Sequence, residues 1–116
     1  MHILIHGADS PQRKTLHDQL ARLGHATTEQ TTPAQAEHAF GFFAFDLVIT
    51  QWGETGPHLL QRMRETRNNT PVIITTGGGR SNKELEEIRT LGAKILENPV
   101  SRNDLEVAIN ELAGEK

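Results

Sequence analysis

The sequence predicts a single α/β domain, residues 1–116, in which five strands alternate with five helices around a parallel sheet. Short aliphatic runs are separated by longer segments in which apolar residues recur every three or four positions. Continuous apolar strands of this kind are typical of a parallel sheet that helices cover on both faces. A chain of 116 residues suits one such core. The predicted strands fall at 2–6, 25–29, 47–49, 72–74 and 94–97.

The first unit pairs a buried strand at 2–6 with a helix that starts after Ser10. Ser10 can cap the helix through its hydroxyl, and Pro11 suits the first helical position. Gly24 is expected to end the helix. The apolar stripe of this helix is Leu16, Leu20 and Leu23.

The second unit begins with a threonine-rich strand at 25–29, which we expect at an edge of the sheet. Thr32 and Pro33 repeat the signal for a helix start. The clearest continuous strand, 47–49, follows this second helix. The predicted stripe of the second helix is Ala36, Ala39, Phe40 and Phe43.

The remaining helices follow the same pattern. Gly56 and Pro57 are expected to open a third helix with Leu59, Leu60 and Met63 inward. Ser81 can cap a fourth, with Leu85 and Ile88 inward, and Ser101 can cap the last. The stripe of the last helix is Leu105, Ala108, Ile109 and Leu112. Arg62, Arg64 and Arg67 are expected to form a solvated face of the third helix.

Composition limits the classes of function. A net charge of -3 argues against a nucleic-acid-binding surface, and the absence of cysteine excludes disulfides and thiolate metal sites. The apolar start of the chain is too short for a signal peptide or membrane span, so we expect a cytoplasmic protein. His2 and His6 lie four residues apart on a strand, roughly 13 Å, so we expect no metal site there.

Four segments, taken in order, resemble response-regulator receiver domains. They are ILIHGADSPQRKTLHDQLARLGH, DLVITQW, TPVIITTGG and LGAKILENPV, and with their order and spacing the resemblance covers essentially the whole chain. The resemblance implies a flavodoxin-like (βα)5 fold: a doubly wound, five-stranded parallel sheet in the order 2-1-3-4-5 with helices on both faces. It also implies a cis peptide bond before Pro99.

The residues that give receivers their chemistry are replaced here. The resemblance places the Mg²⁺-binding acidic pair at Gly7 and Ala8, and the phosphate-accepting aspartate at Gln51. The lysine that would pair with the phosphoryl group falls on Asn98. An amide cannot form an acyl phosphate. The hydroxyl at the end of the fourth strand, Thr76, and the proline after the fifth strand, Pro99, are retained. The predicted rim of this neutral pocket is Asp9, Trp52, Glu54 and Gly77.

Alternatives stay open at three rim positions. Asp9 is either an exposed acid beside a helix start or, with the alignment shifted by one, a member of the acidic pocket. Trp52 is either a lid over the pocket or an anchor for a partner. The loop from Gly77 to Arg80 is either flexible or holds an anion.

We therefore expect a pseudo-receiver that signals without phosphorylation, cofactor or enzymatic activity. Its partner would be another protein or a second copy, bound through the fourth helix, fifth strand and fifth helix. The alternatives are a small-molecule sensor that uses the vacated pocket and a residual phospho-receiver that uses Asp9 or Glu54. No nucleophile–base pair supports an enzyme. The expected interaction residues are Leu85, Arg89, Ile95, Glu97, Arg102 and Glu106, with Ile95 where receivers carry an aromatic switch residue.

Overall fold

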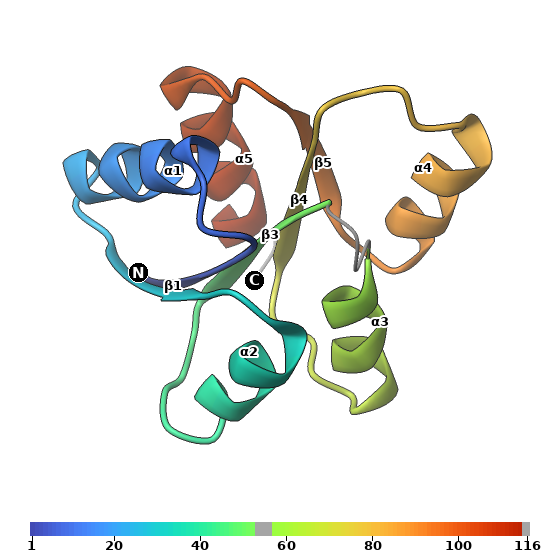
Figure 1. Cartoon of the computed structure of the whole chain (residues 1–116), viewed down its shortest axis with the longest axis horizontal. Helices are drawn as coiled ribbons and strands as arrows, with labels where there is room; N and C mark the ends of the chain where they lie inside the picture. Colours follow the sequence, from blue (N-terminus) through green and yellow to red (C-terminus); the bar gives the residue numbers. More distant parts are fainter. Residues whose placement is uncertain (53–56, 115–116) are drawn as a thin grey trace.

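Five parallel strands form one sheet in the order β2-β1-β3-β4-β5, which confirms the predicted topology (Figure 1). A computed structural model describes residues 1–52 and 57–114. None of the helices in these ranges is long and apolar enough to cross a membrane. The elements are β1 (His2–His6), α1 (Pro11–Arg22), β2 (Ala26–Gln30), α2 (Pro33–Ala39), β3 (Leu47–Gln51), α3 (His58–Glu65), β4 (Val72–Thr76), α4 (Asn82–Thr90), β5 (Lys94–Glu97) and α5 (Arg102–Gly114).

The predicted hydroxyl caps start four of the helices. Ser10 Oγ accepts from the Arg13 amide at 3.2 Å, and Ser101 Oγ accepts from the Asp104 amide at 3.0 Å. Reciprocal capping boxes begin α2 and α4. These bonds satisfy amide groups that have no partner inside the helix, so each helix begins at a defined residue.

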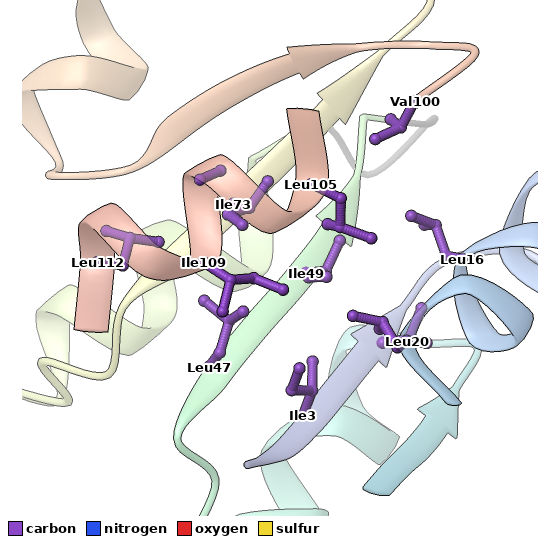
Figure 2. Close-up of a cluster of buried hydrophobic side chains, with 12 residues drawn as sticks. Ile3, Leu16, Leu20, Leu47, Ile49, Ile73, Val100, Leu105, Ile109 and Leu112 are labelled. Atoms are coloured by element: carbon purple, nitrogen blue, oxygen red, sulfur yellow. The ribbon is translucent and has the colours of Figure 1, made fainter. Parts of the chain in front are cut away.

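The helices cover the sheet in two layers. The first core lies between the sheet and α1 with α5, where Ile3, Leu20, Ile49, Leu105 and Ile109 interlock (Figure 2). The second lies on the opposite face and is covered by α2, α3 and α4. Alternate residues of β1 and β3 therefore enter opposite cores, as expected for a sheet that is buried on both faces.

The second helix is shorter than its apolar pattern suggests. It ends at Ala39, and the backbone then tightens into a turn in which Gly41 N donates to His38 O at 3.0 Å. The prediction that Phe43 belongs to the buried stripe is wrong, since this side chain is 50% exposed. Phe45 takes the buried place instead, beside Phe40.

Three smaller predictions also need correction. The second strand begins at Ala26 and ends at Gln30, one residue later than predicted. Arg64 is not a solvated residue, because its guanidinium group turns inward to the carbonyl oxygens of Leu91, Asn68 and Thr70. Leu85 is half-buried, whereas Ile88 is fully buried as predicted.

Candidate functional site

The predicted pocket residues meet at the carboxyl edge of the sheet. Gly7 follows β1, Gln51 ends β3, Thr76 ends β4 and Asn98 follows β5, and these four strands are neighbours. Loop amides extend the pairing past the strands, because Asn98 N donates to Thr76 O at 2.8 Å. This edge is where ligands and chemistry concentrate in open parallel sheets.

Gln51 occupies the space beside Gly7. A Cβ atom added at Gly7 would lie 2.7 Å from Cδ and 2.9 Å from Cγ of Gln51, both closer than atoms can approach. The amide side chain therefore lies against the glycine backbone. Gly7 is buried, whereas its neighbour Ala8 is exposed and stands outside this contact.

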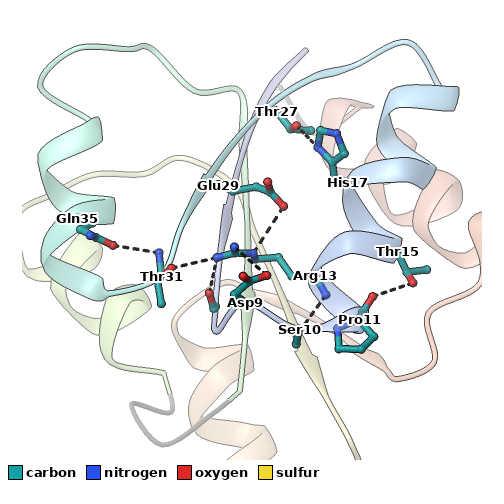
Figure 3. A network of polar contacts seen from close by, with 11 residues as sticks. Asp9, Ser10, Pro11, Arg13, Thr15, His17, Thr27, Glu29, Thr31 and Gln35 are labelled. Carbon is teal, nitrogen blue, oxygen red and sulfur yellow. Dashed lines mark hydrogen bonds and ion pairs between the residues drawn. The ribbon is translucent and has the colours of Figure 1, made fainter.

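Asp9 points away from the pocket and toward α1. Its side chain is 90% exposed and pairs with Arg13 at 3.4 Å. Arg13 is 12% exposed and also donates to Gly7 O at 3.0 Å and Thr31 Oγ1 at 3.1 Å, while it faces Glu29 at 3.6 Å (Figure 3). The structure thus places Asp9 in an ion-pair network between the β1–α1 and β2–α2 loops.

Arg80 stands over the rim of the pocket on the β4 side. Its guanidinium carbon lies 4.4 Å from the centre of the Trp52 ring, which is a cation–π contact. Its Nε donates to Thr76 Oγ1 at 3.5 Å, and Gly78 N donates to the same oxygen at 3.3 Å. Trp52 therefore packs against the second core and also contacts the guanidinium group of Arg80. Gly77, also on this rim, has open space where a Cβ would lie, and Glu54 falls outside the described residues.

The Asn98–Pro99 peptide bond is cis, as the resemblance implies. A cavity of about 250 Å³ lies between this segment and α1, and a second of about 210 Å³ lies beside Thr76. Of the five predicted pocket residues, Asn98 alone lines the first cavity and Thr76 alone lines the second. The space next to Gly7 is occupied by the side chain of Gln51.

A buried histidine lies directly beneath this edge. His6 is 1% exposed, and its Nδ1 lies 2.7 Å from Thr50 Oγ1 across the β1–β3 pairing. Its Nε2 is buried with no hydrogen-bond partner among residues 1–52 and 57–114. Burial, reinforced by the charge that His58 can carry, lowers the pKa of His6. Within those ranges, no group of three or more His, Asp or Glu side chains is placed to hold a metal ion.

The predicted interaction face contains a groove of about 500 Å³ between α4, β5 and α5. Of the predicted residues, Arg89 and Ile95 line it, whereas Leu85 and Glu97 line the smaller hollow beside Thr76. Arg102 and Glu106 are exposed but line neither. The α5 wall consists instead of Asp104, Val107, Ala108 and Glu111.

The spacing of these four residues could have identified the α5 wall. They lie at i, i+3, i+4 and i+7, the spacing of one helical face. Charge is divided across the groove: Arg89 and Lys94 stand on the α4–β5 side, and Asp104 and Glu111 on α5. Lys94 Nζ and Glu111 Oε2 meet at 2.8 Å. Val107 is 47% exposed between the charged groups.

The fold is shared with solved receiver domains. The receiver domain of the Francisella response regulator 1452 has a TM-score of 0.85 at 21% identity over 98% of this chain and 97% of that one. A signal receiver domain of an HD domain-containing protein from Pseudomonas fluorescens Pf-5 gives 0.85 at 22% identity over 98% and 94%. The chemotaxis protein CheY4 of Vibrio cholerae gives 0.82 at 15% over 96% and 97%. No protein-family model and no curated protein matches the sequence.

Proposed function

We propose that this chain is a receiver-like signalling module that acts through protein–protein contact and is not switched by aspartyl phosphorylation. The observation that carries the proposal is the packing of Gln51 against Gly7. In receivers an aspartate at the end of the third strand attacks phosphorus beside a bound Mg²⁺. Here the corresponding side chain is an amide without a nucleophilic oxygen, and it fills space beside the backbone at the expected metal site.

The charge balance of the pocket fits this proposal. Gly7, Ala8, Gln51 and Asn98 are all uncharged, so the pocket needs neither Mg²⁺ nor a lysine to avoid buried charge. The one nearby acid on the first loop, Asp9, is engaged by Arg13 and is exposed. A residual phospho-receiver that uses Asp9 therefore has little support from the geometry. A metabolite sensor is also disfavoured at this place, because Gln51 takes the space that a ligand would need.

A titration with amide NMR detection tests this proposal. Mg²⁺ is added to the protein first, followed by beryllofluoride, which mimics an acyl phosphate. We expect the amide signals of Gly7, Gln51 and Asn98 to stay in place. Clustered, saturable shifts at these three residues would show a working ion site and overturn the proposal.

We place the partner surface at the groove between α4, β5 and α5. Its apolar centre at Ile95 and Val107 is flanked by cationic groups on one side and carboxylates on the other. A two-fold axis through such a surface brings the cationic side of one copy onto the acidic side of its partner. A second copy of this chain is therefore the occupant that we expect.

Sedimentation of charge-reversed variants tests the partner surface. Arg89→Glu and Asp104→Arg are each expected to weaken self-association, and the two changes combined are expected to restore part of it. Arg22→Glu, on the exposed surface of α1, serves as the control. A wild-type chain that sediments as a monomer at all concentrations would exclude the second copy as the partner.

A further inference from the structure

A small polar hollow lies between the β4–α4 loop, α4 and the edge strand β5. Its volume is about 210 Å³, which suits one compact chemical group rather than a drug-sized molecule. Two arginines line it, Arg80 from the loop and Arg89 from α4. Leu85 and Ile95 supply its apolar part. The one carboxylate in the wall, Glu97, is exposed.

The Thr76 hydroxyl lines the same hollow and has hydrogen-bonding capacity left. Thr76 is 2% exposed, and its Oγ1 accepts from Gly78 N and from Arg80 Nε. Both lone pairs of the oxygen are therefore engaged, and its hydrogen remains to be donated. No residue in 1–52 or 57–114 accepts that hydrogen, and the two bonds that Oγ1 does accept are long, at 3.3 and 3.5 Å.

The present partners of the two arginines are weak competitors for an anion. Arg80 meets Glu84 at 3.7 Å and Arg89 meets Glu86 at 3.0 Å, and the carboxylate side chains are 41% and 70% exposed. Exposed pairs of this kind contribute little to stability because water screens them. An oxyanion inside the hollow would instead receive charge-assisted bonds from planar guanidinium donors and the Thr76 hydroxyl together.

We infer that this hollow binds the oxyanion group of a small ligand, a phosphate or a carboxylate, without a metal ion. Thr76 and Arg80 would hold the group from the β4 side, and Arg89 from α4. Glu97 would oppose binding by charge repulsion and so limit the affinity. The site is separate from the Gln51–Gly7 contact, so it does not depend on whether the chain can be phosphorylated.

Titrations with inorganic phosphate and with acetate, at constant ionic strength and with a chelator present, test this inference. Amide NMR shifts at Thr76, Gly78, Gly79 and Arg80 provide one readout. The fluorescence of Trp52 provides the other: this is the only tryptophan in the chain, and the Arg80 guanidinium lies on its ring. We expect saturable changes in both signals with at least one of the two anions, and the anion that saturates identifies the ligand class.

Variants of the charged residues that line the hollow should differ in their affinity for the anion in a defined order. Arg80→Gln and Arg89→Gln are each expected to raise Kd about tenfold, the usual effect of losing one charged hydrogen bond. Arg80→Lys retains the charge and should lose less, and Glu97→Gln should tighten binding. Arg62→Gln is the control, because Arg62 is an exposed arginine of α3 that pairs with Glu37 of α2 and Glu65 of α3.

Three results would overturn the inference. The first is the absence of a saturable response to both anions. The second is a set of shifts that spread over the surface and follow ionic strength alone. The third is a Kd that Arg80→Gln and Arg89→Gln leave at the wild-type value while their NMR spectra show the native fold.

Discussion

The side chain of Gln51 lies against the backbone of Gly7, across the gap between the ends of β3 and β1. The two residues are complementary, because the absent side chain at one position makes room for the amide at the other. Neither residue can be assigned this role alone from the sequence, where they stand 44 positions apart. The contact joins the two positions at which the resemblance places a phosphate acceptor and a metal ligand.

Substitution of Gly7 by alanine tests this complementarity. The new Cβ would overlap Cγ and Cδ of Gln51, so that side chain must move. Because the Gln51 side chain is flexible and half-buried, we expect a loss of only about 1 kcal/mol in unfolding free energy. In the double variant Gly7→Ala/Gln51→Ala the overlap is removed, and part of the loss should be recovered. Urea unfolding of the two single variants and the double variant measures this coupling.

Gly77→Ala is the matched control. A Cβ at Gly77 meets nothing within 4 Å and the backbone there is not left-handed, so alanine should cause no loss of stability. Equal destabilisation by Gly7→Ala and Gly77→Ala would contradict the steric explanation.

The fold was predictable because each element carries a local signal. Hydroxyl caps before proline or glutamate, continuous aliphatic strands and period-3.6 stripes all agree with one topology. The failure at Phe43 has a local cause as well: four phenylalanines between positions 40 and 45 extend an apolar pattern beyond the end of the helix. Periodicity alone does not show which of them the tertiary structure buries.

The candidate site was predictable only in part. The resemblance identified which positions meet at the carboxyl edge of the sheet, since the order of strands determines that edge. It did not show that Arg80 lies on Trp52 or that Arg13 engages Asp9, because both contacts depend on loop conformation. It also did not place Asp104 and Glu111 in the groove, because that depends on which face α5 turns toward β5.

Arg64 should be important for stability although it lies among exposed arginines. Its guanidinium group donates to Leu91 O at 2.7 Å, Asn68 O at 2.8 Å and Thr70 O at 3.2 Å, and so joins the ends of α3 and α4 to the start of β4. We expect Arg64→Ala to lower the unfolding free energy by about 1–2 kcal/mol, because three half-buried carbonyl groups lose a charged donor.

Arg62→Ala is the control for Arg64, and both variants can be compared by thermal unfolding. Arg62 is exposed and, within residues 1–52 and 57–114, bonds to the surface carboxylates of Glu37 and Glu65, so its loss should change stability little. A larger effect at position 62 than at position 64 would contradict the assignment of Arg64 as the structural residue.

His6 should make the domain less stable in mild acid. Its pKa in the folded chain is lowered by burial, whereas in the unfolded chain it returns to about 6.5. The unfolded state therefore binds more protons between these two pKa values, and stability rises with pH in that window. The stability that comes from neutral, buried His6 is fully present above about pH 6.5 and is lost as the pH falls toward the pKa of His6 in the folded chain.

Urea unfolding across the pH range checks this dependence. His6→Gln removes the titration and should flatten the curve below about pH 6.5. The pKa of His25 is also lowered, by burial and by the neighbouring terminal amine, so His25→Gln is the comparison variant. An unchanged pH profile in His6→Gln, with a flattened one in His25→Gln, would assign the acid sensitivity to His25 instead.

Restoring receiver chemistry should require several changes together. Gln51→Asp supplies the acceptor, but Gly7 and Ala8 offer no carboxylate for Mg²⁺ and Asn98 offers no cation for the phosphoryl group. We therefore expect Gln51→Asp alone to leave the spectrum unchanged when Mg²⁺ and beryllofluoride are added. The combined variant Gly7→Asp/Ala8→Asp/Gln51→Asp/Asn98→Lys should show saturable shifts, because it supplies the acceptor, the carboxylates for Mg²⁺ and the cation together. If Gln51→Asp alone binds beryllofluoride, an aspartate at position 51 is sufficient, and the residues at positions 7, 8 and 98 do not prevent acceptor chemistry.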